Sequence, residues 1–170
     1  LTTVQSTSPA DGSNPTDSNS MLPQTPHKKL IMQSKIGAVT ISTASTTTYT
    51  VTVAAKAGGG GNAFYIDGVQ APSITINEGS SAIFNLSDNT VDSHPFYLST
   101  TSDGSHNSGS VYTTGVTFKI NGSSVSQSAY ASGYTSATTR ALEITVAIGA
   151  PTLYYYCSSH SGMGNSISTP

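Results

Sequence analysis

From residue 48 onward, short runs of β-branched and aromatic residues alternate with turn residues along the chain. Such runs are typical of strands, and here they cover residues 48–53, 63–66, 73–76, 81–86, 96–99, 116–120, 141–148 and 152–157. Turns between them are indicated by Asp67-Gly68, Glu78-Gly79, Asp103-Gly104 and Asn121-Gly122. No segment of helical length has a clear 3.6-residue repeat, so the pattern predicts an all-β sandwich.

The first third of the chain has a different pattern. Residues 1–29 consist mainly of Ser, Thr, Pro, Asn, Gly and Asp, a composition that cannot bury a core and predicts an extended tail that becomes ordered against a partner. Residues 30–57 hold further β-branched runs at 30–32 and 38–41 and are predicted to be a strand-forming arm or linker. Four glycines at 58–61 predict a flexible break, which makes residues 58–170 the expected sandwich domain.

Charge is scarce in this protein. Charged residues make up 8% of the 170 residues, the formal net charge is −2, and the six Lys and Arg residues are spread along the chain. Binding to nucleic acid depends on clustered positive charge, so we expect no nucleic-acid partner. No stretch approaches the length of a membrane span, so we expect no membrane partner either. A surface with so few charges is expected to be solvated by hydroxyls and amides or covered by neighbouring subunits.

Residues for hydrolytic chemistry are also scarce. The predicted domain lacks a Gly-x-Ser-x-Gly elbow and a His-Glu-x-x-His helix, and its acidic residues are only Asp67, Glu78, Asp88, Asp92, Asp103 and Glu143. Cys157 and His160 could suggest a thiol nucleophile and its general base. Because they lie three residues apart at a strand end, however, they are better placed to bind one metal ion than to act as such a pair. We therefore expect no enzymatic activity.

The richest chemistry lies at the last predicted strand. Cys157, the only cysteine, is followed by His160 and Met163 within seven residues, and His94 lies before Pro95 at the start of another predicted strand. One thiolate, two imidazoles and a weak axial thioether are the ligands of a blue-copper electron-transfer site. Gly162 and Gly164 would allow the tight loop that such convergence requires. These four residues are the candidate metal ligands and copper is the candidate cofactor.

Other interpretations of single residues remain open. A lone cysteine after a Tyr-rich strand is often a small buried hydrophobic residue. His106 and His27 lie in polar stretches and are expected to be solvated rather than ligands. Bracing hydrogen bonds around the ligands are expected from Asn89 or Ser93.

The spacing of these residues resembles a known family. Residues from about 63 to 163, with the ending Tyr-Cys-x-x-His-x-x-Met, resemble the cupredoxins of the plastocyanin and amicyanin type, and the loop spacing is similar to that of amicyanin. The resemblance implies a Greek-key β-sandwich with a type 1 copper site. In plastocyanin-like and pseudoazurin-like loops the axial Met comes two positions later, where this chain has Asn165. On that longer pattern Asn165 would occupy the axial position.

A second resemblance covers roughly residues 49–165. Segments 63–69, 93–96 (Ser-His-Pro-Phe), 99–104, 111–116 and 150–164 resemble cupredoxin-like modules in virion proteins of marine tailed phages, especially cyanophages. This resemblance implies a structural protein on the virion surface, such as a capsid decoration, cement, tail or fibre subunit. Its implied partners are copies of itself, as a homo-oligomer, and major capsid or tail proteins, with the tail docked on a neighbour.

Two further functions remain as alternatives. The ligand set by itself is typical of a small secreted or periplasmic blue-copper electron carrier. Tyr112, Tyr130 and Tyr134 in Gly- and Ser-rich segments could stack on sugars in an adhesin, although such aromatics more often cover the ends of a sandwich.

Overall fold

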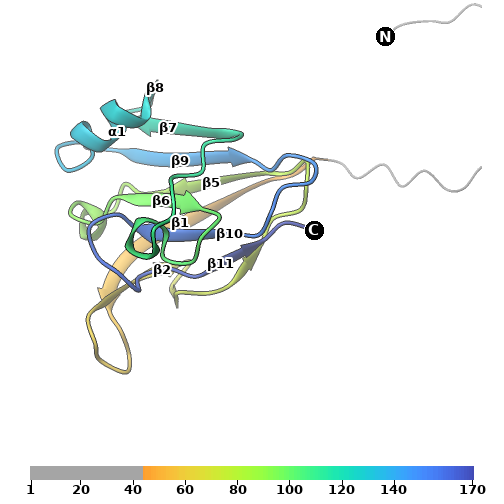
Figure 1. Cartoon of the computed structure of the whole chain (residues 1–170). Coiled ribbons are helices and arrows are strands. Elements are labelled where there is room, and N and C mark those ends of the chain that lie inside the picture. Colours follow the sequence, from red (N-terminus) through yellow and green to blue (C-terminus); the bar gives the residue numbers. More distant parts are fainter. Residues whose placement is uncertain (1–43) are drawn as a thin grey trace, which may run out of the picture. The chain divides into compact units, whose positions relative to one another are not determined.

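The structure, a computed structural model, describes residues 44–170 (Figure 1). Our predictions for the tail at 1–29 and for the runs at 30–32 and 38–41 lie outside the described residues. The elements below therefore belong to the part of the chain from residue 44 onward.

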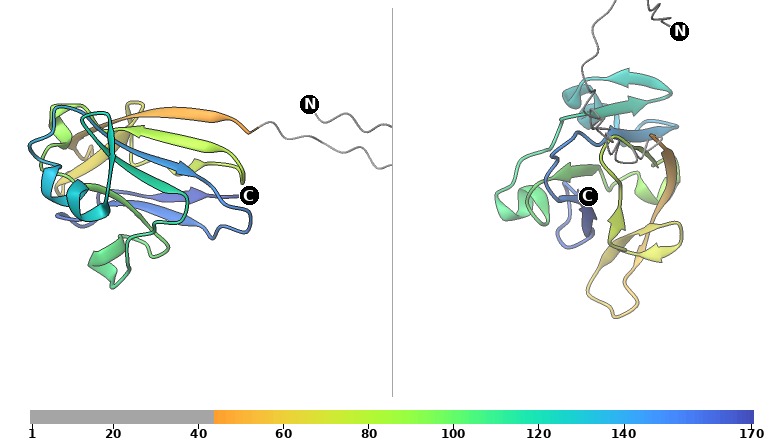
Figure 2. Two further views of the ribbon diagram at one scale, coloured as in Figure 1. Left: turned by 90° about the horizontal axis from the view of Figure 1, so that it is seen from above. Right: turned by 90° about the vertical axis from the view of Figure 1, so that its right-hand side faces the viewer.

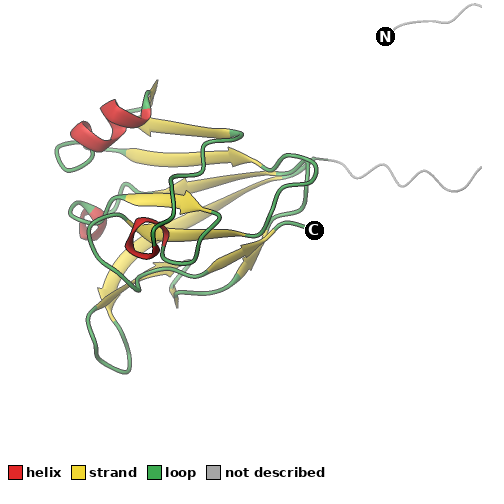
Figure 3. Ribbon diagram, viewed as in Figure 1, coloured by secondary structure: helices red, strands yellow, loops and turns green. Residues whose placement is uncertain are grey.

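Two β-sheets form the framework of the described chain (Figures 1 and 3). The larger sheet has the order β3-β2-β1-β5-β9-β7-β8, formed by Val69–Gln70, Asn62–Ile66, Thr46–Ala55, Ser81–Asn85, Arg140–Thr145, Val116–Ile120 and Ser123–Val125. The smaller sheet has the order β4-β11-β10-β6, formed by Ile74–Thr75, Ser166–Ser168, Leu153–Cys157 and Phe96–Ser99. Both sheets contain parallel and antiparallel pairs. This arrangement confirms the all-β prediction, while the Greek-key and cupredoxin assignments stay predictions.

Three short helices connect the strands: η1 (Asn89–Val91), η2 (Gly104–Asn107) and α1 (Gln127–Gly133). α1 was not predicted from the sequence, because seven residues are too few to display a helical repeat. Its first turn is capped by Ser126, whose side chain accepts a hydrogen bond from the Ala129 amide at 3.2 Å. Among residues 44–170, no helix has the length and apolar character needed to cross a membrane.

β1 lies inside the larger sheet, although we had assigned its residues to an arm or linker. Its first half pairs in parallel with β5 and its second half pairs antiparallel with β2. Val51 and Val53 on this strand are buried in the core. The glycine run at 58–61 is the turn that joins β1 to β2, and three of its glycines have positive φ angles, which favour residues without a side chain.

An aromatic core joins the two sheets. Phe96 on β6 lies 5.1 Å from Phe64 on β2, 4.9 Å from Phe84 on β5 and 5.6 Å from Tyr155 on β10, measured between ring centroids. All four rings are at most 1% exposed. Because aromatic side chains contribute the largest buried areas in a core, this cluster holds the smaller sheet against the larger one. Figure 2 shows the ribbon of the described strands from two further directions.

Candidate metal centre

The pairing of β6 with β10 brings His94 and Cys157 together. These strands are antiparallel, with Cys157 opposite Phe96, and the Ser158 amide continues the ladder by donating to the Pro95 carbonyl at 3.0 Å. His94 therefore lies beside the point where β10 ends. The strand register thus brings together two residues that are 63 positions apart in the chain.

A short turn before β6 orients His94. Asp88 caps η1 by accepting from the Thr90 amide, and Thr90 Oγ1 in turn accepts from the Val53 amide at 2.9 Å. The His94 amide donates to the Val91 carbonyl at 2.8 Å. These bonds attach the turn to β1 of the larger sheet, so the position of His94 depends on both sheets.

The loop after Cys157 returns to the same point. Gly162 has a φ of 69°, in the left-handed region that favours glycine. Gly164 is needed for a different reason, because a Cβ atom there would overlap the Tyr155 carbonyl. The Met163 carbonyl accepts from the Phe64 amide at 2.9 Å, which ties the end of the loop to β2. We call residues 158–164 the ligand loop.

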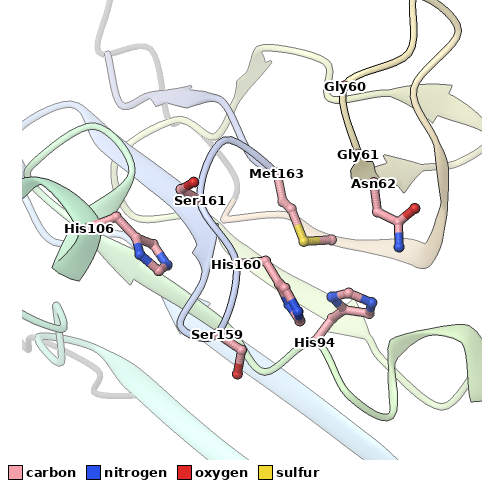
Figure 4. Close-up of a pocket in the computed structure, with 9 residues that line it drawn as sticks. All are labelled: Gly60, Gly61, Asn62, His94, His106, Ser159, His160, Ser161 and Met163. Atoms are coloured by element: carbon pink, nitrogen blue, oxygen red, sulfur yellow. The ribbon is translucent and has the colours of Figure 1, made fainter.

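Three candidate ligands converge at this place, as Figure 4 shows for the two histidine rings. Cys157 Sγ lies 3.8 Å from His94 Nδ1 and 3.7 Å from His160 Nδ1, and the ligand atoms of all three residues lie within 4.8 Å of one another. A sulfur about 2.3 Å and a nitrogen about 2.0 Å from one metal ion, at an angle of about 110–120°, are roughly 3.5–3.7 Å apart. The three residues therefore have the spacing of a mononuclear metal site.

Met163 and Asn165, the two alternatives for an axial ligand, lie in different surroundings. Met163 is 1% exposed and lines the same pocket as His94 and His160, with its thioether directed towards the two rings (Figure 4). Asn165 instead donates from Nδ2 to the Ala71 carbonyl at 2.8 Å and accepts the Ser166 amide. The Asn165 side chain is therefore engaged at the β10–β11 connection, while the Met163 sulfur is free to face the cluster.

Burial shifts the pKa of two candidate ligands, His94 and Cys157. Desolvation, and secondly the charge of His160, lower the pKa of His94, so this imidazole is neutral and can act as a ligand at neutral pH. Burial raises the pKa of the Cys157 thiol; the backbone N–H groups of Ser159 and His160 oppose this rise, and the Asp103 charge adds to it. Without a metal the cysteine is therefore a thiol, which must release its proton when a metal binds.

One side of the cluster faces solvent. Cys157 and His94 are buried, whereas His160 is exposed and lines a surface pocket of about 560 Å³. The rest of the pocket wall comes from the β1–β2 turn, the ligand loop and η2, through Gly60, Gly61, Asn62, Ser159, Ser161 and His106. This wall carries no acidic or lysine side chain.

Two residues near the site, Asp103 and His106, were not predicted from the sequence to contact the strand end and loop that carry the candidate ligands. His106, expected to be merely solvated, is exposed but donates from Nε2 to the Cys157 carbonyl at 2.9 Å. Asp103 accepts from the Gly162 amide at 2.8 Å. Among the described residues, Asn89 and Ser93 show no side-chain hydrogen bond to the ligand loop, so the expected bracing comes from elsewhere. No local signal marks Asp103 and His106, because their segment meets the ligand loop only in the folded chain.

No protein-family model matches the chain, and no curated protein sequence matches it.

Proposed function

We propose that this domain binds one copper ion in a type 1 site and exchanges single electrons through it. The observation that carries the proposal is the convergence of one buried thiol and two imidazoles at distances suited to a shared metal, with a buried thioether facing them. A soft thiolate with two imidazoles and a weak thioether favours copper over the hard cations Mg²⁺ and Ca²⁺.

Each residue has a stated role in this proposal. Cys157 would supply the thiolate, His94 and His160 would supply neutral imidazole nitrogens, and Met163 would supply a weakly bound thioether sulfur. A copper ion held by them would supply one-electron exchange between Cu(I) and Cu(II). The rest of the fold excludes water from the cysteine side, where Cys157 is fully buried.

The exposed edge of His160 is the proposed route for electrons. Its ring lies between the buried ligands and solvent, in a pocket wall of small uncharged residues and histidines. A partner that docks there meets little fixed charge, so we expect electron exchange to depend weakly on ionic strength.

Copper titration of the purified full chain tests this proposal. Copper(II) should bind with a stoichiometry of one and produce an intense visible band from the thiolate, which ascorbate should bleach reversibly. Zinc in place of copper should give a colourless protein of the same stoichiometry and serves as the control. A protein that takes up no copper, or takes it up without the thiolate band, would rule out the type 1 site.

We also propose that the domain serves as a structural subunit of a phage particle. Support comes from the resemblance to phage modules and from the scarcity of charge, since residues 44–170 contain two ion pairs, Lys119–Glu143 and Arg140–Asp92. Much of β1 exposes threonine hydroxyls, at Thr46, Thr47, Thr48 and Thr50. A surface of this kind suits packing among copies rather than free diffusion.

Sedimentation of the native protein from its source separates the two roles. Co-sedimentation with large particles would support the role as a structural subunit. Copper bound to the protein in those particles would support both that role and the proposed copper site. Recovery only as a free small protein would overturn the structural role and favour a secreted or periplasmic electron carrier.

A further inference from the structure

The segment from Asp103 to His106 makes three separate contacts with the strand end and loop that carry the candidate ligands. Asp103 Oδ1 accepts from the Gly162 amide at 2.8 Å. His106 Nε2 donates to the Cys157 carbonyl at 2.9 Å. Between them, Gly104 lies so close to the Tyr156 ring that a Cβ atom on the glycine would overlap it. We call residues 103–106 the brace.

The Asp103 carboxylate is used for this contact rather than for its own helix. Asp103 occupies the N-cap position of η2, where a carboxylate ordinarily accepts a bond from the first turn, yet it makes no side-chain cap hydrogen bond. Its φ of 59° is in the left-handed region, which is uncommon for a residue with a side chain. Asp103 therefore combines a left-handed backbone with a carboxylate that bonds to the ligand loop instead of to its own helix.

The two hydrogen bonds bracket the ligands. Gly162 lies between His160 and Met163, so the Asp103 bond holds the backbone that carries both of them. The His106 bond holds the carbonyl of Cys157 itself, and because a carbonyl only accepts, Nε2 of His106 must carry the proton. Figure 4 shows His106 beside the ligand loop, with the His160 and His94 rings next to each other.

We infer that the brace is a positioning device, in which Asp103 and His106 hold the ligand loop in its metal-binding arrangement before a metal arrives. This inference rests on the proposed copper site for its purpose, although the brace itself is a property of the metal-free chain. Partners around a metal site that orient its ligands typically change metal affinity 10- to 100-fold when removed. Neither residue touches the metal in this scheme.

The sharpest test compares D103A with D103N. D103A removes the acceptor, so the Gly162 amide should exchange with solvent deuterium faster in the metal-free protein, and copper affinity should fall about 10- to 100-fold. D103N retains an acceptor oxygen and should restore both properties close to wild type. The thiolate band of the D103A copper complex should also shift or broaden, because the ligand loop is less fixed.

Asp67 provides a matched control. It too has a left-handed backbone, with a φ of 49°, and its Oδ1 accepts a backbone amide, from Thr50, at 2.8 Å. Asp67 does not line the pocket. D67A should therefore cost similar folding stability while leaving Gly162 exchange, copper affinity and the band unchanged. Equal effects of D103A and D67A on these three readouts would overturn the inference.

His106 is tested in the same way. H106Q retains an N–H donor and should bind copper nearly as the wild type does, whereas H106A should bind it more weakly. If the wild-type chain binds no copper, the proposed function fails, but Gly162 exchange in the metal-free D103A and D103N proteins still decides whether the brace orders the loop. Unchanged Gly162 exchange in D103A would overturn the brace even in a protein that binds copper.

Discussion

Cys157 Sγ lies 3.8 Å from His94 Nδ1 in a buried position, although 63 positions separate the two residues. The contact joins the end of one strand of the smaller sheet to the start of its neighbour. A thiol and an imidazole at this distance, beside a second imidazole, form a site that a soft metal ion can bridge.

Substitution of the cysteine should remove the copper chromophore and leave the fold intact. In C157S the thiolate is lost, so the visible band should disappear, while far-ultraviolet circular dichroism should keep its β-sheet form. A buried hydroxyl costs about 1–3 kcal/mol if it finds no partner, and thermal unfolding would report that loss. A band that survives C157S would mean that the thiolate is not a ligand.

Met163 and Asn165 should respond differently to substitution. M163L keeps the volume of the buried side chain but removes its sulfur, so copper should still bind with an altered reduction potential. N165A loses the bond to Ala71 and should cost about 1 kcal/mol of stability with an unchanged potential. Protein-film voltammetry of both variants makes the comparison. The opposite result would place Asn165 at the axial position.

The ligand loop should be intolerant of a side chain at Gly164. A methyl group there would overlap the Tyr155 carbonyl, and overpacking of this kind costs about 1–3 kcal/mol. G164A should therefore lower the midpoint of urea unfolding and weaken copper binding. G58A is the matched control, because a Cβ at Gly58 meets nothing within 4 Å. Equal midpoints for the two variants would contradict the predicted close packing.

Buried tyrosines should make the fold sensitive to alkali. Burial raises the pKa of Tyr130, Tyr134 and Tyr155 above the ordinary value of 10.0. The unfolded chain ionises these groups from about pH 10 while the folded chain keeps them neutral, so their contribution is complete below pH 10 and declines above it. Each tyrosine should remove about 1.4 kcal/mol from the free energy of unfolding per pH unit.

Absorbance of tyrosinate against pH, recorded with circular dichroism, measures this effect. The buried tyrosines should ionise together with loss of the β-sheet signal, in one cooperative step. Replacement of Tyr155 by Phe should extend stability to higher pH after allowance for its lost bond to Pro72. Gradual ionisation without unfolding would contradict the prediction.

The strands and part of the site could be predicted from sequence because their signals are local. Alternation of β-branched residues marked the strand segment at 48–53, which is part of β1, and several strands of both sheets. Cys157, His160 and Met163 stood out because they lie within one loop. The strands β3, β8 and β11 escaped notice, since two or three residues are too few to form a pattern.

Tertiary structure decided everything that depends on strand pairing. The register of β6 against β10 brings His94 to Cys157, and the pairing of β1 with β2 and β5 makes residues 46–55 of the predicted arm part of the sheet. The contacts of Asp103 and His106 with the ligand loop arise in the same way. Periodicity reports which face of a strand is buried, but the partner of each strand is set by packing between segments distant in the chain, which no local pattern encodes.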